Sequence, residues 1–582
     1  MGLVQVPLDF VVGTSTMGRT YSFAANFMPI LDEETEFAVK WSNLSDAQMN
    51  EGIRDPIKAF EYMNRYYVLE GNKRVSVLKY FNAVSIPAIV TRKIPKLSDD
   101  YDVRLYYEYM KFNEITGLCS VEFTKLGNAD KLLSLVGKEG RWDDETKEKF
   151  AKVMFDFSKV YNFRGGDRLD IKLGDAITVF MEVFGMDAML EMSENDYNKN
   201  IINTWKEFAA EGEKHKINLV LDPKKVQTKK SLLNYLIPQT QKKLKVVFLY
   251  PREPKTSAWL YSHELGRMYL DETFSDKLET ENNVEQVLED IIKSGADIVF
   301  CVGPQMMPNS LKVAVEHPEV YILNCSLNAP HPYIRTYYGR MYEAKFLAGM
   351  IAGAVTDNER VAYIADYPIY GMIANINAFA LGVASVNPRA KVYLAWSKTK
   401  DYDRNKFLEE NDLHYVSDQD IITPNDASRY FGLYKLQDGQ ALNLAMPIWN
   451  WGVFYEKLLQ SVLAGSYKAE GQEQVKALNY WWGMSAGVID LICSKHVPYG
   501  VKRLADHLKS DITKGEIVPF FGKIYDQKGE LKNKGEHEMK PSDIMKMDWL
   551  VDNIVGNIPP MSEFIDNAKM VVELKGVEEN KL

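Results

Sequence analysis

The sequence predicts an α/β protein built from three successive parts. From Leu244 onward, short apolar runs with strand character alternate with helical patterns, the order that produces parallel sheets with crossover helices. Before that point, residues 98–243 are mostly helical, and residues 1–97 mix short strands with turns. We therefore expect domains at 1–97, at 98–243 as a helical segment ending in a basic, proline-punctuated linker, and at 244–582.

Charge and cysteine content indicate which partners and which cellular compartment to expect. The formal net charge is −10, so we expect no broad basic surface for nucleic acid. The cysteines lie beside apolar runs without a C-x-x-C pair, which favours buried thiols in a reducing compartment. The first residues lack a basic n-region, an apolar core and a lipobox cysteine, so we expect a cytoplasmic protein. The longest apolar stretch, 346–355, is about half of a membrane span, and we expect no transmembrane segment.

A strand, a tight turn and a helix are predicted between residues 65 and 80. Gly71 and Asn72 make the turn, and Lys73 and Arg74 begin the helix. Such a helix start combines backbone N–H groups, the positive end of the helix dipole and a guanidinium donor. We predict that these four residues bind phosphate, the alternative being a charged helix start on the surface. The loop at 13–20 lacks the ending of a P-loop, and we expect a structural turn there.

Together with the preceding box at 52–57 (Gly-Ile-Arg-Asp-Pro-Ile), this stretch resembles the ParB/sulfiredoxin-like domain. The resemblance implies binding of CTP or ATP, usually with magnesium, as in DNA-partitioning clamps, transcription factors and reductases. Reductase chemistry needs a cysteine where this chain has Asn72, so we disfavour that activity.

In ParB proteins DNA-binding helices follow this domain. Residues 176–184 and 198–208, on either side of Gly185, have the pattern of a helix-turn-helix. Acidic residues between and within these stretches, such as Glu191 and Asp196, weaken a surface that would face phosphates. DNA binding therefore stays open.

Five buried strands are predicted in the last part of the chain, at Lys245–Tyr250, Ala296–Val302, Val320–Asn324, Val361–Ala365 and Lys391–Trp396. Between the first two we expect an amphipathic helix, Asn283–Lys293. The fourth strand opens onto Asp366, and the helix that follows carries Asn375 and Asn377 near its start. Polar groups thus gather at strand ends, where parallel sheets bind ligands.

Several ordered motifs of this part resemble the basic membrane protein (BMP) family of type I substrate-binding proteins, the PnrA-like nucleoside receptors of ABC transporters. They are Tyr338–Ala344 with Phe346–Gly349, Ala378–Gly382 with Val386–Pro388, Pro519–Ile524 with Asp526–Gly529, and Met547–Val551 with Ile558–Pro559. The resemblance covers about 245–560. It implies a periplasmic-binding fold with two α/β lobes that close on a purine nucleoside or a related purine.

Family contacts carry over to three positions: the first-helix aromatic residue to Trp259, the post-strand aromatic residue to Trp396, and a strand-end carboxylate to Asp418. The family's basic residue near the final strands has no counterpart, since this chain has Trp449 and its neighbours there. Aromatic faces suit a flat heteroaromatic ring, and carboxylates and amides suit its polar edge. The complete predicted set is Trp259, His263, Ser326, Asp366, Asn377, Trp396, Asp418 and Trp449.

Core roles remain open for several of these residues. A tryptophan beside a strand can belong to the core, Asp366 can cap the following helix, and His263 can be a satisfied helix residue. We expect no catalytic residue and no metal ligand.

The preferred function is a cytoplasmic sensor, in which a purine-binding clamp is coupled to a nucleotide-binding domain, in a homodimer. Two alternatives stay open: the substrate-binding component of a nucleoside ABC importer, and a nucleotide hydrolase or DNA-binding regulator.

Overall fold

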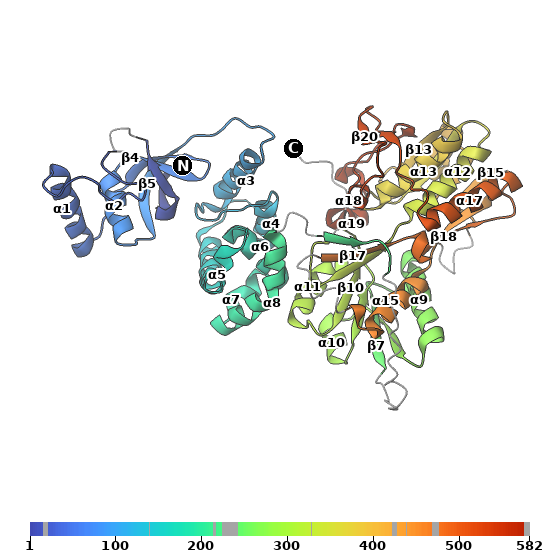
Figure 1. Ribbon diagram of the computed structural model, residues 1–582, viewed down its shortest axis with the longest axis horizontal. Helices are drawn as coiled ribbons and strands as arrows, with labels where there is room; N and C mark the ends of the chain where they lie inside the picture. Colours follow the sequence, from blue (N-terminus) through green and yellow to red (C-terminus); the bar gives the residue numbers. More distant parts are fainter. Residues whose placement is uncertain are drawn as a thin grey trace. The chain divides into compact units, whose positions relative to one another are not determined.

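The computed structural model of the protein describes residues 1–15, 21–138, 140–212, 217–223, 243–327, 329–421, 428–437, 439–467 and 477–575. The chain divides into two compact units, Met1–Gly212 and Glu213–Leu582 (Figure 1). The predicted loop at 13–20 and the predicted linker lie largely outside the described residues.

The first unit opens with a mixed five-stranded sheet of order β1-β5-β3-β4-β2. Its strands are β1 (Gly2–Pro7), β2 (Val11–Thr14), β3 (Ile57–Tyr62), β4 (Arg65–Glu70) and β5 (Ser85–Arg92). Alternate residues of β3 and β5 are buried, as expected for strands with one covered face. Two helices accompany the sheet, α1 (Glu36–Asn50) and α2 (Asn72–Tyr80). The strand, turn, helix and strand predicted between residues 65 and 90 are confirmed.

Six helices complete this unit: α3 (Tyr101–Thr116), α4 (Asn128–Val136), α5 (Asp144–Phe163), α6 (Leu173–Phe184), α7 (Met186–Glu191) and α8 (Glu194–Gly212). Helix α6 is buried along almost its whole length and is the centre of this bundle. The two predicted helices around Gly185 exist, but α7 lies between them. The exposed side of α8 carries Glu194 and Asp196 beside Lys199, so DNA binding stays a prediction without support from this surface.

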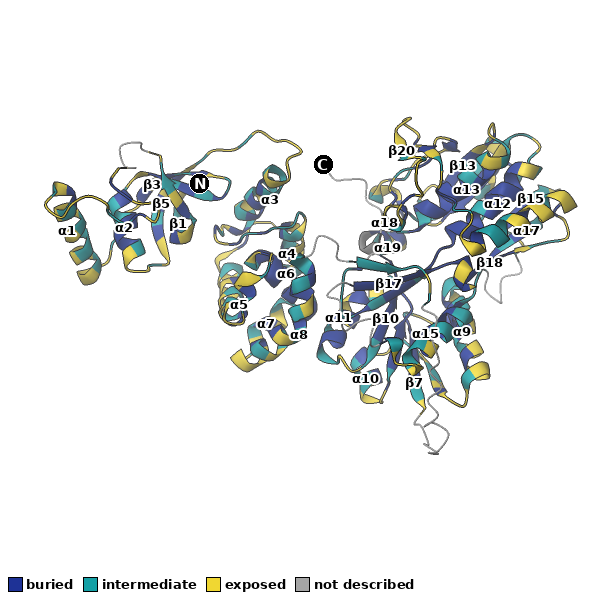
Figure 2. Cartoon of the chain, in the orientation of Figure 1, coloured by how far each residue is buried: buried dark blue, intermediate teal, exposed yellow. Residues whose placement is uncertain are grey.

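The second unit contains two seven-stranded sheets, each in its own lobe. The sheet of lobe 1 is parallel throughout, in the order β6-β17-β11-β10-β9-β7-β8. Its strands are β6 (Ile217–Val220), β7 (Leu244–Tyr250), β8 (Leu278–Val284), β9 (Ile298–Cys301), β10 (Tyr321–Cys325), β11 (Arg335–Gly339) and β17 (Ala477–Trp482). Its helices include α9 (Ala258–Phe274), α10 (Leu288–Lys293), α11 (Met307–Glu316) and α15 (Trp451–Leu463). Figure 2 shows the central strands of this sheet buried.

The sheet of lobe 2 has the order β18-β16-β15-β14-β12-β13-β21. Its strands are β12 (Arg360–Ala365), β13 (Lys391–Trp396), β14 (Tyr415–Ser417), β15 (Leu433–Gln437), β16 (Gln440–Trp449), β18 (Ile489–Cys493) and β21 (Ile554–Val555). Strands β14, β12, β13 and β21 are parallel, whereas β15, β16 and β18 pair antiparallel. A small hairpin of β19 (Lys523–Tyr525) and β20 (Leu531–Lys534) stands apart. The helices include α12 (Tyr342–Val355), α13 (Met372–Val386), α14 (Arg404–Glu410), α17 (Tyr499–Lys514), α18 (Pro541–Met545) and α19 (Asp566–Lys575).

Helices α12 and α13 approach each other at three glycines. A Cβ on Gly349 would collide with the carbonyl oxygen of Phe379, and one on Gly382 with that of Phe346. Gly353 meets the carbonyl of Val383 in the same way. The Gly349-x-x-x-Gly353 spacing is therefore a packing feature of a globular lobe. Within the described residues, no helix has the length and apolar character needed to span a bilayer.

The α/β class with two lobes is confirmed, and all five predicted strands of the second unit form. The helix predicted at Asn283–Lys293 is wrong in its first half, because Asn283 and Val284 end β8 and the helix begins at Leu288. Among the described residues β8 pairs with β7 alone, and such an edge strand tolerates polar side chains. The four cysteines are unpaired, and Cys493 is half-buried rather than buried.

Candidate ligand-binding site

Four aromatic rings form one cluster where the chain passes between the lobes. Trp259 begins α9, Tyr338 lies near the end of β11, Trp449 ends β16 and Trp451 begins α15. The Trp259 ring lies edge-on to Trp449 at 5.2 Å and to Trp451 at 5.6 Å. Trp449 and Trp451 are stacked at 5.3 Å, and Tyr338 lies 5.4 Å from Trp449. Trp451 is buried, while the other three rings are half-buried and keep accessible surface.

The local sequence explains how Trp449 reaches this position. Gly339 ends β11 directly against the indole, and a Cβ there would lie 2.6 Å from a ring carbon of Trp449. The backbone N–H of Asn450 donates to the carbonyl of Val488 at 2.8 Å, which fixes the turn between β16 and α15. Gly339 at the end of β11 thus leaves room for the indole of Trp449 at the end of β16.

His263 lies in the core beneath this cluster. Its side chain is fully buried and stacks on Trp451 at 4.1 Å. Nδ1 lies 2.5 Å from the hydroxyl of Tyr455, and Nε2 lies 3.8 Å from the Cys325 sulfur. Burial holds the pKa of His263 well below its usual value, so the ring is neutral. The structure therefore places His263 as a support for Trp451, and not at an accessible surface.

Asn377 and Trp396 also have structural partners. The Asn377 amide donates to the carbonyl of Trp549 at 2.8 Å, and its oxygen accepts from the N–H of Val551 at 3.1 Å. The indole N–H of Trp396 donates to the carbonyl of Asn557 at 2.8 Å, and the ring is buried. Both residues attach the C-terminal segment to lobe 2. The polar groups that they would offer to a ligand are therefore already hydrogen-bonded within the protein.

Asp366 and Asp418 lie at the ends of β12 and β14, at the predicted edge of the sheet. Asp366 accepts a hydrogen bond from the Ser397 hydroxyl. Asp418 accepts from the Tyr434 hydroxyl at 3.2 Å and lies 3.6 Å from the Arg404 guanidinium. Burial raises the pKa of Asp418, and Arg404 opposes that shift.

A buried ion pair stands beside these carboxylates. Lys345 on α12 is 2 % exposed, and its ammonium lies 2.6 Å from Asp420 and 3.2 Å from the Ser417 hydroxyl. Burial raises the pKa of Asp420, while Lys345 lowers it. Lobe 2 therefore presents three carboxylates whose charge is balanced in part by two cations on the same lobe.

Two polar side chains have little exposed surface. Ser326, just beyond β10, is 4 % exposed, and its hydroxyl has no hydrogen-bond partner among the described residues. Asn375 lies in the first turn of α13, and it is 6 % exposed. The start of α13 faces lobe 1, because a Cβ on Gly371 would lie 3.4 Å from Leu327 and 3.8 Å from Tyr338. Polar groups and aromatic rings from both lobes are thus brought together around this helix start.

The predicted phosphate site occupies the start of α2 in the first unit. Gly71 is the N-cap with φ of 102°, and a Cβ there would lie 2.5 Å from Ile57. Asn72 is buried, and its amide oxygen has no partner among the described residues. Arg74 donates from Nη1 to the carbonyls of Asp55 and Pro56, at 3.1 and 2.5 Å. The Lys73 ammonium lies 4.4 Å from the centre of the Phe37 ring.

Sequence reasoning missed Tyr338, Trp451 and Lys345 as parts of the site. Tyr338 belonged to a matched motif, and Trp451 follows Trp449 by two residues, so both carried a signal. Lys345 lies in an apolar helix and carried none, since its role depends on the loop that brings Asp420 to it.

Residues 243–428 match the family described as "ABC transporter substrate-binding protein PnrA-like". A purine-binding protein of Brucella abortus is 27 % identical over 340 residues, which cover 55 % of this chain and 95 % of that protein. The putative ABC transporter glucose-binding protein TsgA13 of Haloferax volcanii is 28 % identical over 271 residues, covering 43 % of this chain and 67 % of that protein.

Among solved structures, the crystal structure of sulfiredoxin from Arabidopsis thaliana is similar at 20 % identity. It covers 16 % of this chain and 85 % of that one, with a TM-score of 0.12. The C-terminal unit is thus a two-lobed α/β domain, and its residues 243–428 match the PnrA-like family of ABC transporter substrate-binding proteins.

Proposed function

We propose that the second unit binds a purine nucleoside or a closely related heteroaromatic molecule between its lobes. The observation that carries this proposal is the half-buried ring cluster of Trp259, Tyr338 and Trp449 at the passage between the lobes. Flat heteroaromatic rings gain from stacking and edge-to-face contact with such rings, beyond the area that they bury. The purine-binding relative from Brucella abortus supports the same ligand class.

The polar groups around the cluster suit the rest of such a ligand. The Ser326 hydroxyl has no hydrogen-bond partner among the described residues, and Asn375 adds an amide with little exposed surface. Carboxylates at 366 and 418 accept hydrogen bonds from hydroxyl or amino groups. A neutral ligand with several donors is favoured over a phosphorylated one, because a phosphate would meet three carboxylates on lobe 2.

The test is calorimetric titration of the full chain with adenosine, inosine and glucose. We expect saturable binding of a nucleoside, weakened about tenfold or more in Trp449→Ala, which removes a stacking face. Trp549→Ala is the matched control, because Trp549 is a half-buried tryptophan outside the cluster. Binding of glucose alone, or equal losses in both variants, would contradict the proposal.

The second part of the proposal concerns the first unit, which we infer to be a ParB/sulfiredoxin-like nucleotide-binding domain. The start of α2 has no side-chain cap, and the first N–H groups of a helix lack intrahelical partners and suit a phosphate. Arg74 uses Nη1 on backbone carbonyls, which leaves Nε and Nη2 without partners among the described residues. These residues fit the phosphates of CTP or ATP, and magnesium would add charge neutralisation there.

Nucleotide binding is tested by equilibrium dialysis with CTP and with ATP, each with magnesium. We expect Arg74→Gln to weaken binding and Arg104→Gln on α3 to leave it unchanged. Release of inorganic phosphate at a steady rate would favour the hydrolase alternative, whereas binding without turnover favours a sensor.

We propose that the two ligand sites are coupled in a cytoplasmic regulator that is not an enzyme and that forms a homodimer. The joining of two ligand-binding modules in one chain motivates this view. Coupling predicts that a saturating nucleoside changes the CTP affinity by about 5–150-fold, and that CTP changes nucleoside affinity by the same factor. Cell fractionation separates this function from that of an importer component, which must work outside the membrane. Sedimentation equilibrium tests the dimer.

A further inference from the structure

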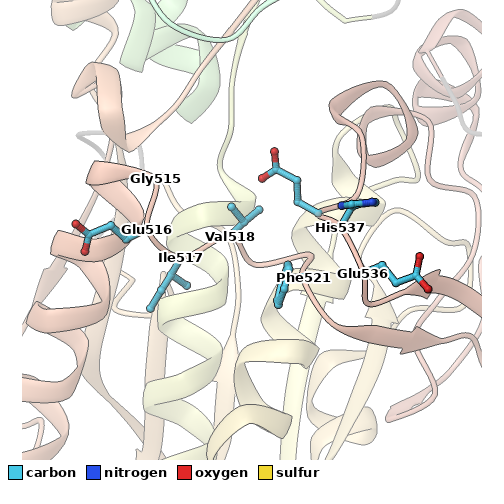
Figure 3. Close-up of a pocket in the computed structure, with 8 residues that line it drawn as sticks. Gly515, Glu516, Ile517, Val518, Phe521, Glu536 and His537 are labelled. Carbon is cyan, nitrogen blue, oxygen red and sulfur yellow. The ribbon is translucent and has the colours of Figure 1, made fainter.

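A cavity of about 440 Å³ lies in lobe 2, away from the aromatic cluster in sequence. It is lined by Gly515, Glu516, Ile517, Val518, Phe521, Glu536, His537 and Glu538 (Figure 3). One wall is the segment that follows α17, and the other is the turn after β20. None of these residues belongs to the site described above.

The floor of this cavity is apolar and held in place. Phe521 is 62 % exposed, although large apolar side chains usually gain by burial. Its neighbour Phe520 is fully buried and packs against Tyr342 at 5.4 Å. The carbonyl of Phe520 also accepts from the N–H of Met539 at 3.2 Å, which ties the two walls together. The exposure of Phe521 is therefore fixed by the fold around Phe520.

The rim of the cavity is acidic. Glu516, Glu536 and Glu538 form no ion pair with any described residue, and the lining includes no lysine or arginine. Figure 3 shows Glu516 and Glu536 on opposite sides, with Val518 and Phe521 between them. An apolar floor between separated carboxylates is complementary to an apolar side chain flanked by cations.

We propose that this cavity is a docking site for a protein partner, which inserts an apolar side chain between lysine or arginine residues. Unpaired carboxylates attract such a segment over a Debye length, and burial of Phe521 supplies the apolar gain. The same charges repel anionic surfaces of nucleic acid or lipid. Because Phe521 is adjacent to Phe520, which packs on the first turn of α12, the docked segment touches the element that begins lobe 2.

The test uses a fluorescent peptide of alternating lysine and leucine and measures its anisotropy with the full chain at low and high salt. We expect saturable, salt-sensitive binding that weakens about tenfold in the triple variant Glu516→Gln, Glu536→Gln, Glu538→Gln, and similarly in Phe521→Ser. The matched control is Glu272→Gln, Asp276→Asn, Glu409→Gln, which removes the same charge from exposed positions elsewhere.

Equal weakening in the control variant, or no binding at all, would overturn the proposal. Thermal unfolding of each variant excludes loss of the fold as the cause. Sedimentation of the protein alone tests whether a second copy of the chain occupies the cavity. Self-association that Phe521→Ser abolishes would assign the cavity to this second copy and overturn the proposal of a basic partner.

Discussion

The hydroxyl of Tyr106 on α3 lies 2.9 and 2.8 Å from the two carboxylate oxygens of Glu61 on β3. Glu61 is fully buried and also accepts from the N–H of Asn64 at 2.7 Å and from Arg92 at 2.5 Å. Arg92 in turn donates to Asn113 of α3 at 3.0 Å. One carboxylate therefore joins the five-stranded sheet to the helical bundle, within a single compact unit.

Glu61→Gln should destabilise the first unit by about 3–5 kcal/mol, because it leaves the Arg92 guanidinium without its counter-charge. Tyr106→Phe should cost about 1 kcal/mol, the usual contribution of one hydrogen bond. Urea unfolding followed by circular dichroism measures both, with the exposed Glu114→Gln as a control of near-zero effect. If Glu61→Gln behaved like this control, the junction would not depend on the buried pair.

Stability of the second unit should fall as the pH drops below about 6.5, because His263 titrates there in the unfolded chain. Burial lowers the pKa of His263 in the folded state, so the unfolded state binds the proton more readily. The free energy of unfolding therefore falls by up to about 1.4 kcal/mol for each pH unit. Thermal unfolding between pH 5 and 8 should show this slope in the wild type. The slope should be smaller in His263→Gln, and an unchanged slope would assign the effect to other groups.

Gly349→Ala and Gly382→Ala should each destabilise lobe 2 by about 1–3 kcal/mol or more, because the added methyl meets a backbone carbonyl of the facing helix. Gly500→Ala in α17 is the matched helical control, since nothing lies within 4 Å of its Cβ position. The control should be neutral or slightly stabilising, as alanine favours helix over glycine. Guanidinium unfolding distinguishes the two outcomes.

Lys345→Met should destabilise the protein by about 3 kcal/mol at neutral pH, since Asp420 is left buried without its cation. Loss of the lysine raises the pKa of Asp420 further, so this carboxyl becomes protonated more easily in the folded state. A raised folded pKa favours the folded state at low pH and penalises it as the pH rises. The deficit relative to wild type should therefore shrink toward pH 5, whereas Lys293→Met, at an exposed position of α10, should show little deficit at any pH.

The bounds of a strand could be predicted from the sequence where the strand is buried along most of its length. The strand at Lys391–Trp396 was predicted to its exact bounds, because a strand covered on both faces is apolar at nearly every position. The predicted helix Asn283–Lys293 extends over the last two residues of β8, where Asn283 has low strand propensity and the pairing of β8 with β7 outweighs that preference.

The site was predictable in part. Two of the predicted site residues, Trp259 and Trp449, lie in one aromatic cluster, because the start of α9 meets the end of β16 there. Asn375 and Asn377 lie two residues apart on α13 and project in different directions around the helix axis. The orientation of the helix about its axis therefore decides which of them bonds the C-terminal segment. That orientation is set by tertiary contacts with Trp549 and Val551, which no local pattern encodes.

Strand β6 has a practical consequence for anyone who produces the second unit alone. Residues 217–220 pair with β17 along Ala477–Tyr480 and form one of the two edge strands of the lobe 1 sheet. A recombinant fragment that starts at Leu244 would strip this strand away and leave the backbone of β17 open to other chains. If such a fragment aggregates in storage, we expect the loss of β6 to be the cause. A fragment that starts before Ile217 keeps this strand and should not aggregate in this way.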